Sequence, residues 1–123
     1  MIYLMTILAL FQQDDFVNYE KAFEEFGKSK RPVIIVVTTK SCRFCGPMKD
    51  NLRAIKKEYP NMILCEVPLA KAQVQFDFLD FKRGVPQTFM YVYDNEREVV
   101  ARLPTIIGLK PKSEIYKAWG MPN

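Results

Sequence analysis

Residues 33–45 read VIIVVTTKSCRFC, and they carry most of the information about the fold. The run from Val33 to Val37 is entirely β-branched and does not alternate with polar residues, which is typical of a central strand covered on both faces. A short polar loop follows, and Cys42 and Cys45 come directly after it. In open α/β sheets, ligands and chemistry gather at the carboxyl ends of the strands. We therefore predict a buried central strand that delivers two cysteines to the functional edge of a sheet.

The residues before this strand predict one further strand and one helix. Residues 3–10 are largely apolar, and we interpret them as a buried first strand. Aromatic residues at helical spacing over 16–26 predict a helix with one apolar face. Asp14 or Asp15 is the expected N-cap, and Gly27 is the expected C-terminal stop. A strand, a helix and a second strand in this order imply a parallel crossover unit.

The residues after the cysteines also alternate between helix and strand. A helix that runs from the cysteines to about Tyr59 would place its apolar residues on one face. The apolar stretch 62–67 predicts a strand, and it contains Cys65. Residues 70–81 are mixed in composition and predict a short helix. The residues of this helix that we expect to face inward are Val74, Phe78 and Phe81.

The C-terminal third of the chain predicts a hairpin and a last helix. Strands over 88–93 and 99–103 flank a short polar turn, which is the pattern of a β-hairpin. The last helix starts at Pro111 or Ser113 and stops at Gly120. The predicted order of elements is therefore β-α-β-α-β-α-β-β-α.

The size and charge of the chain exclude several classes of protein. With 123 residues it is long enough for one core, and we predict a single domain, 1–123, that acts as a monomer. The 18 basic and 14 acidic residues give a formal net charge of +4, spread along the sequence, which favours acidic partners but not nucleic acid. The apolar segment 2–11 is too short to cross a membrane and lacks the basic start of a signal peptide, although a cleaved or anchoring segment is the alternative to a buried strand. We therefore expect no membrane association and a cytoplasmic location.

Cys42 and Cys45 have the spacing of a redox pair. Two thiols separated by two residues can close a small disulfide when the first lies at the start of a helix, where backbone N–H groups and the helix dipole stabilise its thiolate. The second thiol, one turn further along, can then attack a mixed disulfide. Lys40, Arg43 and Lys49 lie close in sequence and favour the thiolate further. The chain has no histidine, so no imidazole can act as a base or as a metal ligand.

Two other interpretations of the cysteines stay open. Cys42 and Cys45 can instead serve as a helix cap and a buried core thiol, without a redox role. A metal site would need about four ligands. One chain offers three sulfur atoms and no histidine, so we predict no metal. Cys65, inside an apolar strand, is expected to be a small buried hydrophobic residue.

A proline far from the cysteines completes a known pattern. Val85 and Pro86 precede the predicted hairpin, and Pro86 follows Cys42 by 44 residues. Together these features resemble the thioredoxin/glutaredoxin superfamily over nearly the whole chain. The resemblance implies an α/β thioredoxin-like fold, with a central mixed sheet of four to five strands flanked by helices. It also implies a cis peptide bond before Pro86, opposite the cysteines, and pairing of the Val85 backbone with substrate.

The details of the sequence are similar to two branches of this superfamily. Residues 39–45 and 85–89 are similar to the active-site and proline loops of glutaredoxins, whereas the start of the last helix, 109–115, looks like that of thioredoxins. Glutaredoxins hold glutathione with a glycine pair and an acidic residue, which have no counterpart near Gly108. The buried acid of thioredoxins falls within 33–37, where no acidic residue occurs, and its lysine partner is absent too.

The resemblance implies a protein-disulfide reductase that works by dithiol exchange. The implied catalytic residues are Cys42 and Cys45, which would cycle through a Cys42–Cys45 disulfide without a further cofactor. The implied substrate-binding residues are Lys40, Arg43, Phe44, Val85 and Pro86. The implied substrates are disulfide-containing proteins, among them ribonucleotide reductase. The implied electron donor is a thioredoxin reductase, or glutathione as a co-substrate.

Two alternatives remain from the sequence alone. Pro47 suits the first turn of a helix, so a helix that begins at Cys45 would make Cys45 the exposed nucleophile. We favour Cys42 as the nucleophile because of its spacing to Pro86 and because an aromatic residue, Phe44, directly precedes Cys45. The alternative function is a redox-inactive or weakly active protein-binding module on the same fold. The residues expected to line its partner groove are Phe44, Phe76 and Phe81.

Overall fold

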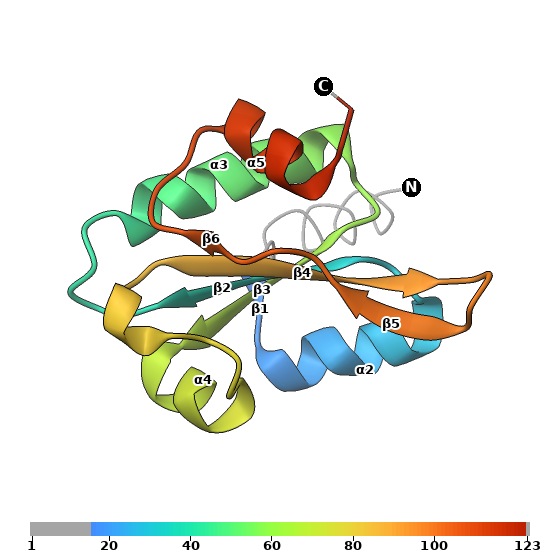
Figure 1. Ribbon diagram of the computed structural model, residues 1–123, viewed down its shortest axis with the longest axis horizontal. Coiled ribbons are helices and arrows are strands. Elements are labelled where there is room, and N and C mark those ends of the chain that lie inside the picture. Colours follow the sequence, from blue (N-terminus) through green and yellow to red (C-terminus); the bar gives the residue numbers. More distant parts are fainter. Residues whose placement is uncertain (1–15, 123) are drawn as a thin grey trace, which may run out of the picture.

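The computed structural model describes residues 16–122 of the chain, and the strand predicted over 3–10 lies outside them. The described residues form a mixed sheet with helices on both of its faces (Figure 1). The strands are β1 (Phe16–Val17), β2 (Val33–Thr38), β3 (Ile63–Pro68), β4 (Gln87–Asp94), β5 (Val99–Arg102) and β6 (Ile106–Ile107). The helices are α2 (Tyr19–Ser29), α3 (Cys45–Glu58), α4 (Leu69–Gln75), the short 3-10 helix η1 (Phe81–Arg83) and α5 (Lys112–Trp119).

The sheet has the order β1-β3-β2-β4-β5, and β6 also pairs with β4. Strands β1 and β2 run parallel to β3, whereas β4 runs antiparallel to β2, β5 and β6. All six residues of β2 are buried, so the predicted central strand is confirmed. The predicted hairpin is confirmed as well, since β4 and β5 pair up to Asp94 and Val99. Strand β6 is an addition that the sequence did not indicate.

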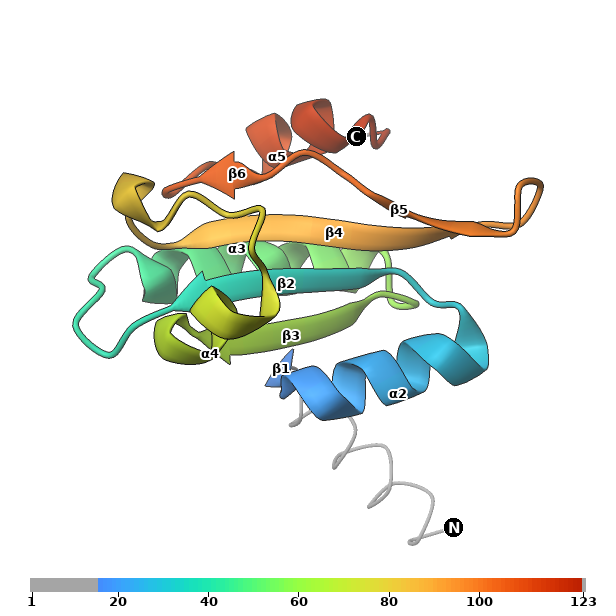
Figure 2. The ribbon, with the colours of Figure 1, turned by 60° about the horizontal axis from the view of Figure 1, so that its bottom comes forward.

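Two hydrophobic cores lie on opposite faces of the sheet. Helices α2 and α4 cover one face, and α3 and α5 cover the other (Figures 1 and 2). Alternate residues of β2 contribute to each core: Ile35 and Val37 pack with α2 and α4, whereas Ile34 and Val36 pack with α3 and α5. Full burial of one such side chain contributes about 1.5–3 kcal/mol. The central strand therefore stabilises both layers at once.

Helix α5 is held in place by its aromatic residues. Trp119, the single tryptophan of the chain, is 7% exposed, and its Nε1 donates a hydrogen bond to the Pro104 carbonyl oxygen at 2.8 Å. The hydroxyl of Tyr116 donates to Glu58 of α3 at 2.8 Å. The helix ends at Gly120, whose φ of 66° is a left-handed conformation that favours glycine, as predicted. No helix within residues 16–122 has the length and apolar character needed to cross a membrane.

Helix α2 differs from its prediction at both ends. The Asn18 side chain accepts a hydrogen bond from the Lys21 backbone N–H at 2.8 Å, so the N-cap is Asn18 and not Asp14 or Asp15. The two residues before Asn18 pair with β3 and are therefore extended. At the other end, Gly27 does not stop the helix, which continues for two more residues.

The segment 70–81 forms a shorter helix than predicted. Helix α4 has seven residues, and the chain turns before η1, so the helical period does not continue to Phe81. Val74 is 81% exposed, and the prediction that it faces inward was wrong. Phe78 and Phe81 are partly buried, and Phe76 fills the core beneath α4 instead.

Candidate functional site

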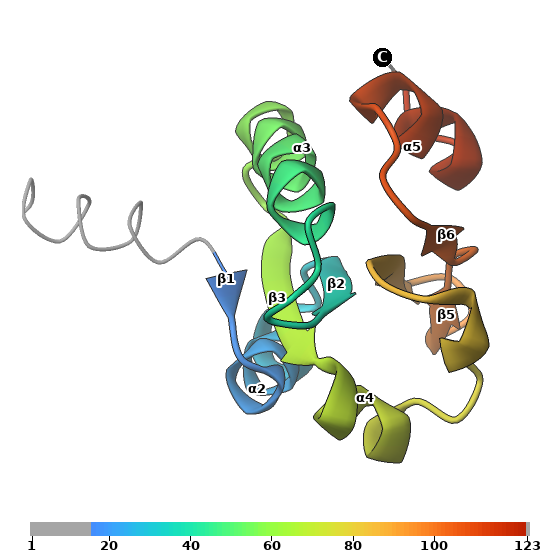
Figure 3. The ribbon, with the colours of Figure 1, turned by 90° about the vertical axis from the view of Figure 1, so that its left-hand side faces the viewer.

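Three loops meet at one end of the sheet. Strand β2 ends there, β4 begins there and β6 ends there, because Gln87 pairs with both Val37 and Ile107. The loops 39–44, 80–86 and 108–110 extend from this end, which lies on the left in Figure 1 and faces the viewer in Figure 3. The topology thus brings the two cysteines and the predicted substrate-binding residues to the same end of the sheet.

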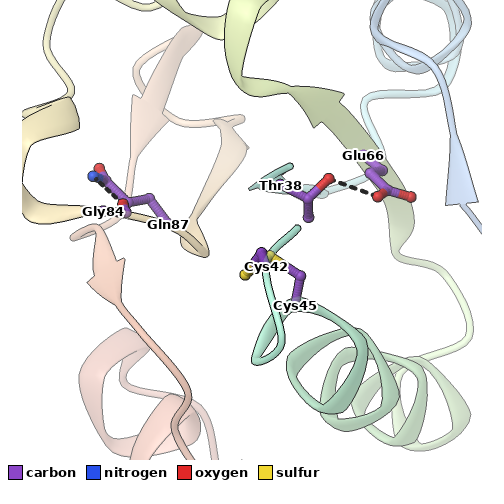
Figure 4. The surroundings of a disulfide bond; sticks show 6 residues. All are labelled: Thr38, Cys42, Cys45, Glu66, Gly84 and Gln87. Atoms are coloured by element: carbon purple, nitrogen blue, oxygen red, sulfur yellow. Dashed lines mark hydrogen bonds between the residues drawn. A yellow bond between two sulfur atoms is a disulfide. The ribbon is translucent and has the colours of Figure 1, made fainter. Parts of the chain in front are cut away.

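Cys42 and Cys45 form a disulfide with a Cα–Cα distance of 5.5 Å (Figure 4). Helix α3 begins at Cys45 and not at Cys42, so the position predicted for the start of this helix was wrong. The physical reason lies in Pro47, which occupies the first turn, where its missing N–H would have no partner in any case. Cys42 precedes the helix and is partly exposed, whereas Cys45 is 5% exposed. Cys45 is therefore the first residue of the helix, but Cys42 is the more accessible of the two cysteines.

Exposed cationic and aromatic side chains lie in the loop that carries Cys42. Lys40 and Arg43 are exposed, and Phe44 is 45% exposed. The Arg43 guanidinium carbon lies 4.9 Å from the centroid of the Phe44 ring, within the range of a cation–π interaction. Three of the predicted substrate-binding residues thus form one exposed surface next to the cysteines.

The proline loop extends from the same end of the sheet, where β4 begins. The peptide bond between Val85 and Pro86 is cis. Pro86 is buried, and its carbonyl oxygen accepts a hydrogen bond from the Gly108 N–H at 2.8 Å, which ties two of the three loops together. Within residues 16–122, no hydrogen bond engages the backbone N–H or C=O of Val85. The Val85 backbone is therefore free to pair with another chain.

Gln87 holds the loop that carries η1. Its side chain is fully buried, and Nε2 donates to the carbonyl oxygen of Asp80 at 2.7 Å. Nε2 also donates to the carbonyl oxygen of Gly84 at 2.9 Å (Figure 4). Its Oε1 has no hydrogen-bond partner among the described residues. Asp80 and Gly84 are both exposed, so one buried amide anchors two exposed residues of this loop.

A polar cluster that sequence reasoning missed lies beneath the first turns of α3. Glu66 of β3 accepts hydrogen bonds from the Thr38 hydroxyl at 2.7 Å and from Lys49 Nζ at 2.6 Å. In the view of Figure 4, Thr38 lies between the disulfide and the Glu66 carboxylate. Residues 33–37 contain no acidic side chain. The carboxylate beneath α3 comes instead from Glu66, on the neighbouring strand β3. Its signal in the sequence is a single charge in the apolar strand around Cys65.

The ionisation of two neighbouring groups follows from their surroundings. Burial alone would raise the pKa of Glu66, but the hydrogen bonds from Lys49 and Thr38 outweigh it and hold the pKa below the usual 4.5. Burial raises the pKa of the Cys65 thiol to about 12. Cys65 is fully buried and forms no disulfide, so the prediction of a small buried hydrophobic residue is confirmed.

The aromatic groove expected for a pure binding module does not form. Phe44 is exposed beside the cysteines, whereas Phe76 is 3% exposed in the core and Phe81 is partly buried against the same core. These three side chains therefore do not share a surface. Residues 16–122 also contain no group of three or more cysteine, aspartate or glutamate side chains arranged to hold a metal ion.

Comparison with known proteins identifies the fold. No protein-family model matches the chain, and no curated protein sequence matches it. Among solved structures, thioredoxin from Trichomonas vaginalis superposes with a TM-score of 0.63 at 15% identity, over 87% of this chain and 96% of that one. A thioredoxin from Thermus thermophilus gives 0.64 at 14% identity, over 86% and 85% of the two chains. Oxidised thioredoxin O2 from Arabidopsis thaliana gives 0.61 at 16%, over 87% and 96%.

The chain is therefore a thioredoxin-fold protein. The thioredoxin-like α/β fold implied by the sequence resemblance is confirmed, with its mixed sheet, its flanking helices and a disulfide at the start of α3. At identities of 14–16%, these structures show the fold alone. The chemistry of the site therefore depends on this chain's own residues.

Proposed function

We propose that this protein reduces protein disulfides by dithiol exchange through Cys42 and Cys45. The observation that carries the proposal is the unequal exposure of the two cysteines in the Cys42–Cys45 disulfide. Cys42 is partly exposed, whereas Cys45 is 5% exposed. An accessible thiol can attack an external disulfide, and a protected neighbour can then resolve the mixed disulfide. The structural likeness to thioredoxins supports this assignment.

The reaction has two exchange steps. The Cys42 thiolate attacks one sulfur of the substrate disulfide, so that bond breaks, a Cys42–substrate disulfide forms, and the other substrate sulfur leaves as a thiolate that takes up a proton. Cys45 then loses its proton and attacks the Cys42 sulfur, which forms the Cys42–Cys45 disulfide and releases the second substrate thiolate. The substrate gains two electrons and two protons, and the dithiol loses them.

The groups around the cysteines suit these roles unequally. Cys42 lies just before the N-terminus of α3, where the helix dipole favours a thiolate, and the exposed cations Lys40 and Arg43 add to this effect. Glu66 is a poor proton acceptor for Cys45, because the hydrogen bonds from Lys49 and Thr38 lower its pKa and so make its carboxylate a weak base. We therefore assign the acceptance of the Cys45 proton to water.

The remaining parts of the site would hold the substrate and accept electrons. The unpaired backbone of Val85 can form hydrogen bonds with an extended peptide, and Phe44 offers apolar contact area beside Cys42. Re-reduction of the disulfide needs a dithiol or thiol donor, which we propose to be a thioredoxin reductase or glutathione in the cytoplasm. Ribonucleotide reductase remains one candidate among the disulfide-containing substrates.

The test is a redox titration combined with cysteine variants. The purified protein is equilibrated in dithiothreitol buffers of graded potential and alkylated, and its mass is read. We expect a two-electron transition between roughly −200 and −270 mV. The variant Cys45→Ser should accumulate a mixed disulfide with a peptide substrate, Cys42→Ser should not, and Cys65→Ala serves as the control that keeps the pair. Absence of a reversible Cys42–Cys45 disulfide would rule out the mechanism and favour a binding module.

A further inference from the structure

The three loops around the disulfide carry a concentration of positive charge. We call this surface the basic rim, and it consists of the basic residues of loops 39–44, 80–86 and 108–110. Its members are Lys40, Arg43, Lys82, Arg83 and Lys110. All five are exposed, and they are brought to the same end of the sheet by the pairing of β4 with β2 and β6.

The basic rim accounts for the net charge of the whole chain. The three loops contain five basic residues and one acidic residue, Asp80, an excess of four positive charges. The full sequence has 18 basic and 14 acidic residues, so 13 of each sign remain elsewhere and their formal charges cancel. These charges are spread along the sequence, but folding collects them at one end of the sheet. The protein is therefore polarised toward its disulfide.

The charges of the basic rim are not neutralised within the protein. Across residues 16–122, no ion pair includes any of its five members, whereas Lys49, Lys71 and Lys112 each contact a carboxylate elsewhere. An unpaired cluster of like charges creates a local positive potential that attracts anions and raises their rate of association. The five cations of the basic rim can therefore form ion pairs with a negatively charged partner.

A pocket gives the basic rim one concave point of contact. It has a volume of about 370 Å³ and lies between η1, β6 and α5. Its charged lining residues are Arg83, Lys110 and Glu114, and much of the rest is apolar, including Ile106 and Ile107. Two cations and one carboxylate leave an excess of positive charge, so the pocket suits a side chain with an aliphatic stem and a carboxylate end, such as glutamate.

We propose that the basic rim selects disulfide substrates whose cysteines are flanked by acidic residues, with one carboxylate seated between Arg83 and Lys110. This proposal rests on the proposed function and names its substrate class. The attraction acts mainly on the association step, because exposed charges steer encounter more than they hold a complex. It is therefore sensitive to ionic strength, since salt screens charges separated by more than about 10 Å at 0.1 M.

The test compares three peptide disulfides that differ only in the residues flanking one cysteine: two glutamates, two glutamines or two lysines. The dithiothreitol-reduced, desalted protein is mixed with each peptide, and the second-order rate constant of reduction is measured at low salt and at about 0.5 M salt. We expect the glutamate peptide to react about tenfold or more faster than the lysine peptide at low salt. The difference should largely disappear at high salt.

Variants locate the effect on the basic rim. The double variant Arg83→Gln/Lys110→Gln should lower the ratio of the glutamate rate to the glutamine rate at low salt. The matched control is Lys57→Gln/Lys117→Gln, which removes the same charge from exposed sites outside the basic rim and should keep the ratio. Equal loss of the ratio in both double variants would overturn the proposal, because net charge and not the basic rim would then set the rate.

The outcomes separate this proposal from the function on which it rests. Reduction of all three peptides at equal rates would overturn the acidic-substrate proposal and leave dithiol exchange intact. Failure to reduce any peptide, together with no reversible disulfide in the redox titration, would overturn both. Salt-sensitive binding of a single-stranded DNA oligonucleotide through Arg83 and Lys110, with equal peptide rates, would assign the basic rim to nucleic acid and overturn the proposal.

Discussion

Replacing Gln87 by methionine should lower the free energy of unfolding by about 2 kcal/mol, because the substitution removes two hydrogen bonds that each contribute about 1 kcal/mol. The Gln87 side chain is fully buried, and its Nε2 donates to Asp80 and Gly84 at 2.7 and 2.9 Å. Methionine keeps most of the side-chain volume, so the effect of a cavity stays small. The two carbonyl groups belong to exposed loop residues and can bind water after the change, which limits the loss.

The substitution Gln87→Glu should cost more than Gln87→Met, and its cost should depend on pH. At neutral pH the new carboxylate would face the same two carbonyl oxygens without a donor between them. Burial and this repulsion would raise its pKa above the usual value of a glutamate carboxyl. The unfolded state then ionises more readily than the folded state. The variant is therefore least destabilised below about pH 4 and loses further stability as the pH rises toward 7.

The assay is urea unfolding followed by circular dichroism at pH 7 and at about pH 4. With an m-value of about 2 kcal/mol per molar urea, the loss for Gln87→Met corresponds to a midpoint shift of about 1 M. The matched control is Gln73→Met on the exposed side of α4, for which we expect almost no shift. A Gln87→Met midpoint within about 0.25 M of the unsubstituted protein would refute the anchoring role assigned to this side chain.

Two further predictions concern buried groups near the site. In the native oxidised protein at about pH 8, Cys65 should resist iodoacetamide and should react after denaturation in urea, because burial raises its pKa to about 12. Rapid addition to the native protein, read by mass spectrometry, would contradict its burial. The variant Glu66→Gln should be less stable than the unsubstituted protein at pH 7, where the lowered pKa keeps Glu66 ionised beside Lys49. This difference in urea midpoint should be present above pH 4.5 and disappear as the pH falls through the lowered pKa, and an equal difference at pH 7 and at about pH 3 would contradict it.

The elements that could be predicted from the sequence are those whose signal is local. The β-branched run of β2 needs only its own residues to indicate a strand buried on both faces. The last helix is bounded by Pro111 and Gly120, and each acts through its own backbone preferences. The start of α3 shows the limit of this approach, because the cysteine spacing favoured Cys42 whereas Pro47 favoured Cys45, and the helix follows the proline.

The features that could not be predicted depend on contacts between distant segments. Strand β6 has two residues, too few to show a periodic pattern, and it exists only because β4 offers an open edge. The ion pair between Lys49 and Glu66 joins α3 to β3, and neither residue has a local reason to contact the other. The basic rim was invisible for the same reason, since its members become neighbours only when three strand ends meet.

The placement of Trp119 determines what intrinsic fluorescence reports in this protein. As the single indole of the chain, it lies at the end of α5 and donates its N–H to Pro104, in the connection between β5 and β6. Its emission spectrum is therefore an optical probe of whether the C-terminal helix is docked on the sheet. A fluorescence melting curve of this chain follows the detachment of α5, and it follows unfolding of the whole domain only if α5 and the sheet come apart together.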